Sequence, residues 1–335
     1  MKILITGVTG FVGRHLVDHL RNAVPDGEIW GLVWEEDPAQ IPAAVHPLMG
    51  DLTLPSSLAR SLEQVRPDVV LHLAGATSVA SSWQQPDRSF QVNAIGTLNL
   101  LEALRSLDLD PTVVVATSAE IYGAVAAEDQ PIREDSPLNP ISPYATSKAA
   151  QDLITAQYYR GFKLRTVRLR LFPHTGPGRP PQFAASGFAR QIARIERGLE
   201  PPLIAVGNLD PIRDFSDVRD IARAYWAAAV RGRPGEAYNV GSGRGVSIRE
   251  VLDHLIALSD LEIETRVDPG RLRPADIDCL VADTSRFAEA TGWQPEIPLA
   301  RCLADLLDWW RFSVERTEEP NSTRPKSRGI VKPGE

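Results

Sequence analysis

The sequence opens on an apolar run that is followed by three evenly spaced glycines. Residues 2–6 are short and apolar, as is typical of a buried parallel strand. The glycines come next at intervals of three residues, and an amphipathic helical pattern begins among them. Glycines let the backbone turn sharply and approach a pyrophosphate, while the first turn of a helix offers unpaired N–H groups. The pattern therefore predicts a strand, a turn and a helix that bind a dinucleotide through Gly7, Gly10, Phe11, Val12 and Gly13.

Composition narrows the class of protein. The 335 residues are 43% hydrophobic and 24% charged, which suits one or two globular domains. No apolar run approaches the ~20 residues of a membrane helix. A net charge of −7 without a basic block argues against nucleic acid as a partner. Cys279 and Cys302 form neither a disulfide framework nor a metal pattern, and Lys2 already lies in the first strand. We therefore expect a cytoplasmic protein with no signal peptide, no metal site and no membrane partner.

The loop after the second predicted strand bears on the choice of cofactor. Residues 28–33 form that strand, and a dinucleotide fold places the residue just after it against the adenosine ribose. Glu35 stands there, and its carboxylate would accept the ribose hydroxyls and repel a 2′-phosphate. No Arg or Lys lies between Arg21 and Arg60 to bind such a phosphate. We therefore favour NAD(H), with NADP(H) as the alternative. The competing interpretation is that these acids only form a solvated loop.

A serine, a tyrosine and a lysine follow in an order that suits carbonyl chemistry. Ser118 ends a Val-rich strand at 112–117, at the edge where α/β folds bind ligands. Tyr144 and Lys148 stand at i and i+4 in a helix that begins at Ser142, so they share a face. The lysine ammonium and a nicotinium charge are expected to lower the pKa of Tyr144, and the lysine can also hold the nicotinamide ribose. Ser118 would orient the substrate oxygen.

The remaining pattern predicts an α/β fold, a Rossmann-type doubly wound parallel sheet with a smaller C-terminal substrate-binding domain. Further strands are expected at 45–49, 68–73, 164–172 and 237–240, and helices at 55–65, 90–107, 183–197, 216–230, 247–258 and 299–312. His72 is expected to be a core residue without a catalytic role. A Pro- and Gly-rich stretch marks the first crossing between domains. We assign residues 1–172 plus 214–242 to an NAD-binding domain, 173–213 plus 243–314 to a substrate domain, and 315–335 to an unfolded tail.

These motifs resemble the extended short-chain dehydrogenase/reductase family, in its nucleotide-sugar branch. The nearest resemblance is to GDP-6-deoxy-4-keto-mannose reductases and GDP-mannose 4,6-dehydratases, in the stretches 207–209, 213–215, 217–220 and 272–274. The resemblance implies a GDP-linked sugar as substrate, held by Ser78, Arg213 and Arg273. It also implies that Asn93 supports the central strands. The cofactor contacts that it implies are Asp51, Leu52, Leu73, Ala74, Ala76, Asn93, Tyr144 and Lys148. A homodimer is expected, and the apolar face of 90–107 can belong either to the core or in part to the contact between subunits.

Departures from the family pattern bear on the reaction. Phe172 is followed by Pro173, where the family usually has an asparagine that contacts the substrate. The glycine turn holds Phe11 and Val12 where the dehydratases usually have Gln-Asp, and no Arg-rich segment follows the second strand. The last two points favour a reductase. The predicted reaction is the NAD(P)H-dependent reduction of the C4 ketone of a GDP-6-deoxy-4-keto-hexose to GDP-rhamnose, with Tyr144 as the proton donor.

Three alternatives stay open. Glu120 lies two residues after Ser118, and side chains at i and i+2 point the same way if the chain stays extended. In the dehydratases the glutamate at the matching position takes the C5 proton, so Glu120 is also a catalytic candidate and the dehydratase is the first alternative. The second is an NAD-dependent nucleotide-sugar 4-epimerase. The third is a catalytically inactive NAD-binding sensor, which would not require Ser118, Tyr144 and Lys148 together.

Overall fold

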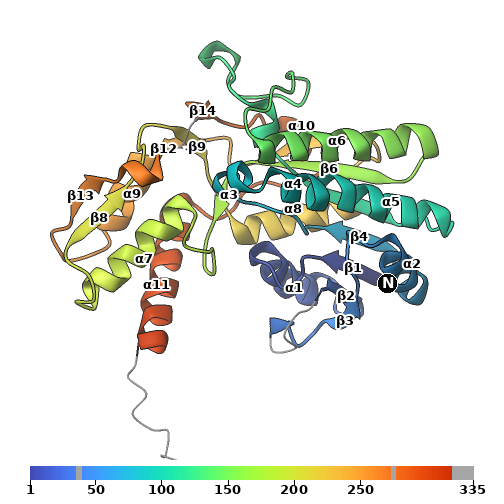
Figure 1. Cartoon of the computed structure of the whole chain (residues 1–335), viewed down its shortest axis with the longest axis horizontal. Coiled ribbons are helices and arrows are strands. Elements are labelled where there is room, and N and C mark those ends of the chain that lie inside the picture. Colours follow the sequence, from blue (N-terminus) through green and yellow to red (C-terminus); the bar gives the residue numbers. More distant parts are fainter. Residues whose placement is uncertain (35–39, 273–276, 319–335) are drawn as a thin grey trace, which may run out of the picture.

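A parallel sheet forms the centre of the computed structural model, which describes residues 1–34, 40–272 and 277–318 (Figure 1). Its seven strands lie in the order β11-β6-β5-β4-β1-β2-β3, and every neighbouring pair is parallel. The strands are β1 Lys2–Thr6, β2 Glu28–Val33, β3 His46–Met49, β4 Val69–His72, β5 Thr112–Ser118, β6 Thr166–Leu171 and β11 Ala237–Val240. The order reverses at β1, beside β4, which is where doubly wound sheets bind ligands. The predicted Rossmann-type fold is confirmed.

Helices cover both faces of this sheet, which explains why most residues of its central strands are buried. Ile3, Leu4 and Ile5 in β1, for example, are fully buried. Helices α1 Phe11–Ala23 and α8 Val218–Arg231 close one apolar core against the sheet. Helices α2 Pro55–Val65, α5 Gly96–Ser106 and α6 Pro143–Phe162 close a second core on the other face. The carboxyl ends of the strands are therefore held in a fixed frame.

The helix predicted over 90–107 is less regular than expected. Phe90–Ile95 is a π-helical turn, and the regular helix α5 starts only at Gly96. Such turns occur frequently at functional sites, and this one carries Asn93. Two short helices, α3 Val79–Gln84 and α4 Pro86–Ser89, precede it. Two 3₁₀ turns, η3 Ala119–Tyr122 and η4 Ala127–Asp129, follow β5.

A smaller part of the chain packs beyond one end of the sheet, where Figure 1 shows α7, α9 and α11 together. These helices share an apolar core with β8 and contribute, among others, Phe188, Ile204, Leu252 and Leu306. Three small sheets have the orders β10-β7, β12-β9-β14 and β13-β8. The strands of these small sheets are β7 His174–Thr175, β8 Leu203–Val206, β9 Ile212–Asp214, β10 Ser216–Asp217, β12 Gly245–Ser247, β13 Glu264–Val267 and β14 Cys279–Leu280. The helices are α7 Ala184–Glu196, α9 Ile248–Ile256 and α11 Leu299–Glu318, with the 3₁₀ turn η5 Pro269–Arg271. Helix α10 Ser285–Thr291 packs instead against the core of the large sheet through Phe287.

Several details of this part differ from the prediction. The segment expected to be helical from 216 starts as strand β10, and α8 begins at Val218. The last helix continues to Glu318, beyond the predicted end at 312 and into the first residues of the expected tail. The capping box of α9, in which Ser247 and Glu250 bond each other's backbone N–H, is confirmed. Within the described ranges, no helix combines the length and apolar character needed to cross a bilayer.

Candidate active site

The predicted glycine turn joins β1 to α1 and fits a dinucleotide diphosphate. Gly7 has a φ of +74°, and a Cβ there would lie 2.8 Å from the backbone nitrogen of Ala74. A Cβ on Gly13 would lie 2.3 Å from the Gly7 carbonyl oxygen, so neither position accepts a side chain. Gly10 precedes α1 without a side-chain cap. The first N–H groups of the helix are therefore available to an anion.

Ser118, Tyr144 and Lys148 line one cavity of about 510 Å³, together with the glycine turn. Ser118 is the last residue of β5, and the other two lie one turn apart near the start of α6. The start of α6 is fixed by Ser142, whose hydroxyl accepts the Ala145 N–H at 3.1 Å. The parallel sheet and this cap bring together three residues that are up to thirty positions apart in the sequence.

The pKa of Tyr144 moves in the opposite direction to the prediction. Burial is the main cause and raises this pKa to about 12, and the charge of Glu120 adds to the rise. Hydrogen bonding with Ser118 and the positive charge of Arg179 lower it only in part. In the protein alone, loss of water around the phenol outweighs the nearby cations, so the pKa of Tyr144 does not show the lowering expected from Lys148 and a nicotinium charge. Tyr144 is therefore fully protonated at neutral pH.

Lys148 is held firmly inside the protein. Its Nζ donates to the Ala116 carbonyl and to Oε1 of Gln151, each at 2.8 Å. Burial lowers the pKa of Lys148 to about 7, since water that would solvate the ammonium is excluded. These two acceptors fix the position of the Lys148 ammonium group, and the side chain lines the cavity.

Asn93 ties the strand ends to the helix that carries Tyr144. Its Oδ1 accepts the Ala76 N–H at 2.8 Å, and its Nδ2 donates to the Ala76 carbonyl at 3.1 Å. The same Nδ2 donates to the Ser147 hydroxyl at 2.9 Å, one residue before Lys148. Asn93 thus links the segment after β4 to α6 without lining the cavity, which agrees with the structural support expected of it.

His72 is a core residue, as expected. It is fully buried at the end of β4, with Nδ1 2.7 Å from the Thr6 hydroxyl and Nε2 2.9 Å from the Thr97 hydroxyl. Burial, and to a smaller extent the charge of Lys148, lowers its pKa to about 3. The imidazole is therefore neutral and satisfied by hydroxyl partners.

Glu120 reaches the cavity by a different backbone path from the one predicted. The chain does not stay extended after β5, because Ala119–Tyr122 form a 3₁₀ turn. The Ser118 hydroxyl accepts the Glu120 N–H at 3.2 Å and so closes that turn. Glu120 nevertheless lines the cavity, and its effect on the pKa of Tyr144 shows that the two groups interact electrostatically.

Arg213 enters the same cavity from the smaller part of the protein. It lies on β9, is 7% exposed and donates from Nη1 to the Ile212 carbonyl at 3.0 Å. The neighbouring Asp214 fixes this strand, since its carboxylate accepts the N–H groups of Ser242 at 2.6 Å and Gly243 at 2.9 Å. A buried arginine thus lines the same cavity as Tyr144 and its partners.

Most of the predicted site residues share this cavity. Those that line it are Gly7, Gly10, Phe11, Val12, Gly13, Leu73, Ala74, Ser78, Ser118, Glu120, Tyr144, Lys148 and Arg213. Asp51, Leu52, Ala76 and Asn93 lie outside its lining. The Asp51 carboxylate accepts the N–H and hydroxyl of Thr53, each at 2.8 Å, while Leu52 packs into the core under α2 and α5. Glu35 and Arg273 lie outside the described residues.

Sequence reasoning missed the contribution of the segment that follows β6. His174 and Arg179 line the cavity, yet they belong to the Pro- and Gly-rich stretch interpreted only as a domain crossing. Gln182 and Phe183, which also line it, come directly after that stretch, at the start of the helix predicted over 183–197. The stretch lacks the periodicity from which elements are predicted. Its signal was the spacing of Gly176 and Gly178, which have φ values of 141° and 85° and form a tight turn just before an arginine.

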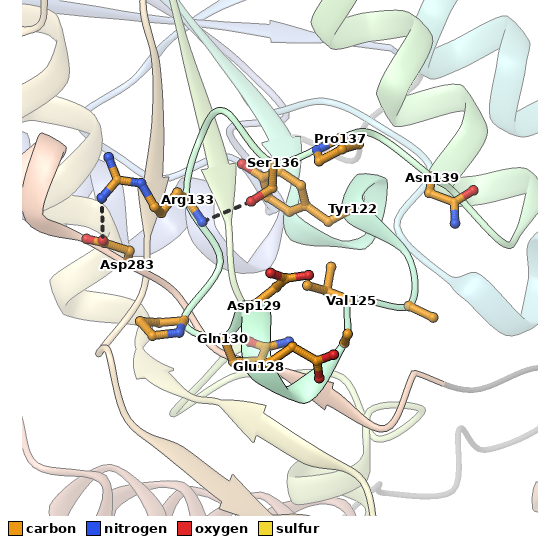
Figure 2. Close-up of a pocket in the computed structure, with 13 residues that line it drawn as sticks. Tyr122, Val125, Glu128, Asp129, Gln130, Arg133, Ser136, Pro137, Asn139 and Asp283 are labelled. Carbon is orange, nitrogen blue, oxygen red and sulfur yellow. Dashed lines mark hydrogen bonds and ion pairs between the residues drawn. The ribbon is translucent and has the colours of Figure 1, made fainter.

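A second cavity, of about 620 Å³, lies under the loop after β5 (Figure 2). Its walls come from residues between Tyr122 and Asn139 and from Asp283. The figure shows Arg133 bridging the two sides, with Nη1 3.7 Å from the Asp283 carboxylate and its backbone N–H donating to Ser136 at 3.3 Å. None of the predicted site residues lines this cavity.

Comparison with known proteins is consistent with this geometry. The family model described as GDP-mannose 4,6 dehydratase matches residues 4–306. A GDP-6-deoxy-D-mannose reductase from Pseudomonas aeruginosa is 36% identical over 313 residues, which is 93% of this chain and 98% of the relative. A GDP-mannose 4,6-dehydratase from Vibrio cholerae is 31% identical over 350 residues, 91% of this chain and 92% of the relative.

Known structures extend the comparison to the whole fold. The structure of RMD from Pseudomonas aeruginosa complexed with NADPH is 35% identical, with a TM-score of 0.83, and the match covers 94% of this chain and all of that one. The UDP-glucose 4-epimerase of Thermus thermophilus complexed with NAD is 30% identical, with a TM-score of 0.82, over 93% and 99% of the two chains. Proteins of this fold thus bind NADPH in one case and NAD in the other.

Proposed function

Because the chain belongs to the GDP-mannose 4,6-dehydratase family, we propose that it reduces the C4 ketone of a GDP-linked 6-deoxy-4-keto-hexose. It is an NAD(P)-dependent enzyme of the short-chain dehydrogenase/reductase type that acts on a nucleotide sugar. The substrate proposed is GDP-6-deoxy-4-keto-mannose and the product GDP-rhamnose. One observation carries the proposal: Ser118, Tyr144 and Lys148 share a cavity in a chain 36% identical to a GDP-6-deoxy-D-mannose reductase.

Tyr144 supplies the proton in this reaction. The nicotinamide cofactor, when bound at the glycine turn, supplies the hydride that adds to C4. Since burial raises the pKa of Tyr144 to about 12, the phenol carries its proton when reduction begins. Tyr144 gives that proton to the C4 oxygen, and Ser118 donates a hydrogen bond to the same oxygen. The ketone thus gains one hydride and one proton and becomes a hydroxyl group.

Lys148 acts beside Tyr144. It lies one turn away on α6, and we assign it to the nicotinamide ribose and to the stabilisation of the Tyr144 phenolate once the proton has left. Its two acceptors, the Ala116 carbonyl and Gln151, would keep Nζ in place through the cycle. The cofactor contacts assigned to Asp51, Leu52 and Ala76 stay proposals, since these residues stand apart from the cavity lining.

The smaller part of the protein is proposed to hold the substrate. Arg213 would bind the diphosphate or ribose of the sugar nucleotide, because a guanidinium fork matches phosphate geometry. Ser78 and Arg273 are assigned to the same ligand. In this division, residues 1–172 plus 214–242 bind the cofactor and 173–213 plus 243–314 bind the substrate. The core shared by α7, α9 and α11 supports it, because it is separate from the cores of the sheet.

A dehydratase is the second candidate, and Glu120 is the observation that favours it. Its carboxylate lines the cavity close to Tyr144, where a base for the C5 proton would be needed. The dehydratase relative is 31% identical and the reductase 36%. We therefore rank the reductase first.

Assays with two substrates, each with and without NADH, distinguish the reductase from the dehydratase and from the other candidate functions. The protein is incubated with GDP-mannose and with GDP-6-deoxy-4-keto-mannose, and products are identified by chromatography and NMR. A reductase converts only the keto sugar and consumes one NADH for each product molecule. Formation of the 4-keto-6-deoxy sugar from GDP-mannose without added NADH would identify a dehydratase, and C4 inversion without added NADH an epimerase. Binding of cofactor without any conversion would identify the inactive sensor.

NAD(H) is proposed as the preferred cofactor, with NADP(H) accepted less well. The support is the sequence around Glu35, where acids stand and no cation compensates a 2′-phosphate. Fluorescence titration with NADH and NADPH tests this preference, and equal or reversed affinities would overturn it.

We also propose that the protein forms a homodimer and is located in the cytoplasm. Large apolar side chains are exposed around α5 and α6, namely Phe90, Ile95, Leu153 and Phe162. Light scattering of the wild-type protein and of Leu153→Glu tests the dimer, which the charged variant is expected to weaken. Cys279 and Cys302 are both free thiols, as a reducing compartment would allow.

A further inference from the structure

A row of four polar side chains lies in the interior of the protein behind Lys148. All four are fully buried, and they are Gln151 on α6, Thr97 on α5, His72 on β4 and Thr6 on β1. At one end of the row, Oε1 of Gln151 lies 2.8 Å from Nζ of Lys148. At the other end, the Thr6 hydroxyl accepts the N–H of Ala74 at 3.1 Å. The row therefore connects two residues of the cavity lining through the protein interior.

Each hydrogen bond along this row has a defined direction. The single proton of the Thr97 hydroxyl goes to the Asn93 carbonyl at 2.7 Å, so the Thr97 oxygen accepts from its other partners. These partners are Nε2 of Gln151 at 2.8 Å and Nε2 of His72 at 2.9 Å. Nδ1 of His72 is then the acceptor for the Thr6 hydroxyl at 2.7 Å. His72 is therefore a neutral imidazole with its proton on Nε2.

These directions decide how the Gln151 amide is turned. Its NH₂ group faces Thr97, so its oxygen faces Lys148 and accepts. Together with the Ala116 carbonyl, this oxygen takes two hydrogens of the Lys148 amino group. The third position on Nζ, an N–H in the ammonium and a lone pair in the neutral amine, is left for the cavity that Lys148 lines. Nζ can therefore keep one position in both charge states.

We propose that Gln151 is a positioning residue for Lys148, and that Thr97 and His72 hold its amide in the required orientation. The inference rests on the proposed function, in which Lys148 binds the nicotinamide ribose. An accepting oxygen beside Nζ stabilises the ammonium and fixes the direction of its remaining N–H. Without that oxygen, the buried ammonium would be less firmly held and would lose its proton more easily.

Other charged and titratable groups surround Lys148. Burial is the cause of its low pKa of about 7. His72 behind it is neutral, and Tyr144 on the same helix is protonated. Glu120, Arg179 and Arg213 line the cavity, and Asp152, one turn further along α6, is paired with Arg168 and Arg170. Because the variants below alter none of these groups, a changed titration of Lys148 reports on the substituted residue.

The test measures the pKa of Lys148 directly. The chain has five lysines, so protein labelled with carbon-13 at the lysine Cε gives few NMR signals, and the spectrum of Lys148→Met assigns the relevant one. Gln151→Met removes the oxygen at similar volume. It should lower the pKa of Lys148 by about one pH unit or more, as for a lost charge-assisted hydrogen bond. Gln151→Glu keeps an oxygen there with a negative charge and should raise this pKa. Gln157→Met, at an exposed glutamine of the same helix, should match wild type.

A second pair of variants tests the orientation of the amide. Thr97→Val removes the acceptor for Nε2 of Gln151 and should lower the pKa of Lys148, in the same direction as Gln151→Met. Thr97→Ser keeps the hydroxyl and should titrate like wild type. An unchanged Lys148 titration in both Gln151 variants would overturn the proposal, and so would an equal change in Gln157→Met. Equal titrations in Thr97→Ser and Thr97→Val would overturn the part assigned to Thr97 and His72.

NADH affinity distinguishes this inference from the proposed function. Gln151→Met should raise the dissociation constant of NADH, measured by fluorescence, more at pH 8 than at pH 6, because a larger share of its Lys148 charge is lost at the higher pH. If the Lys148 titration moves as expected while NADH affinity stays at the wild-type value, Gln151 positions Lys148 and the assignment of Lys148 to the nicotinamide ribose is refuted. The NMR titration needs no turnover, so it decides the role of Gln151 even if the keto sugar is not a substrate.

Discussion

The two parts of the molecule are built on different scales. In the large sheet, each strand has four to seven residues and its interior strands are paired on both sides, and apolar cores press on both faces. In the smaller part, strands of two to four residues form sheets of two or three, around a single helical core. Ser118, Tyr144 and Lys148 belong to the first part, and Arg213 to the second. The proposed reacting groups thus lie at the end of β5 and on α6, while the proposed substrate contact lies on the short strand β9.

The contrast has a consequence for variants. Changes to Ser118 and Tyr144 should affect the chemical step, because the proposed mechanism assigns these groups to the reacting oxygen. Changes in the smaller part should affect the Michaelis constant, because they remove contacts made before and during the reaction. A variant in one part of the molecule that changed the kinetic parameter expected for the other part would contradict this comparison.

Tyr144→Phe should have the largest effect. Removal of the proton donor should lower kcat by roughly 10²–10⁴, the usual contribution of general acid catalysis. Affinity for NADH, measured by fluorescence titration, should be unchanged. Tyr159→Phe, on the same helix, is the control. Turnover close to wild type in Tyr144→Phe would remove this residue from the mechanism.

Arg213→Ala should come next, and in a different parameter. Loss of a charge-assisted phosphate contact, worth roughly 1.5–3 kcal/mol, should raise the Michaelis constant of the sugar nucleotide while NADH affinity stays the same. Arg273→Ala is expected to behave alike. Arg249→Ala is the control, since that exposed arginine on α9 is outside the cavity. A fall in NADH affinity instead would indicate that these arginines bind the cofactor and not the sugar nucleotide.

Lys148 makes stability depend on pH. Its pKa is about 7 in the folded protein, below its ordinary value of about 10.4, so between these pH values the unfolded chain binds more protons. The free energy of unfolding should therefore rise with pH over this range, by up to about 1.4 kcal/mol per pH unit from this group. Urea denaturation at pH 7, 8 and 9 should give a flatter dependence for Lys148→Met than for wild type. The exposed Lys163→Met should follow wild type, and identical slopes for all three would refute the assignment.

Glu120→Gln should have the smallest effect. In a reductase no C5 proton is removed, so loss of this carboxylate should lower keto reduction by less than about tenfold. Glu128→Gln is a matched control, since Glu128 lines only the second cavity. Complete loss of activity in Glu120→Gln, with Glu128→Gln still active, would contradict the reductase and favour the dehydratase.

The same contrast explains what could be predicted from the sequence. Strands β1, β2 and β11 have the predicted bounds, because each is a mostly buried run whose neighbours lie in the same sheet. Strands β8 and β13 were not predicted, since their pairing joins residues about sixty positions apart and neither run is long enough to show a period.

The site follows the same rule. Ser118, Tyr144 and Lys148 were predicted because strand ends and helical spacing are local signals. Arg179 was missed because its position depends on rings and turns brought together only in the folded chain. The pKa of Tyr144 could not be predicted either, since burial outweighs the charges that the sequence displays.

Transfer of a labelled hydride tests the central claim most directly. The protein is incubated with GDP-6-deoxy-4-keto-mannose and NADH that carries deuterium in the transferred position, and the product is examined by NMR. The proposed reaction predicts one deuterium at C4 of a GDP-6-deoxyhexose for each NADH oxidised. An unlabelled product, or GDP-mannose converted without added NADH, would contradict it.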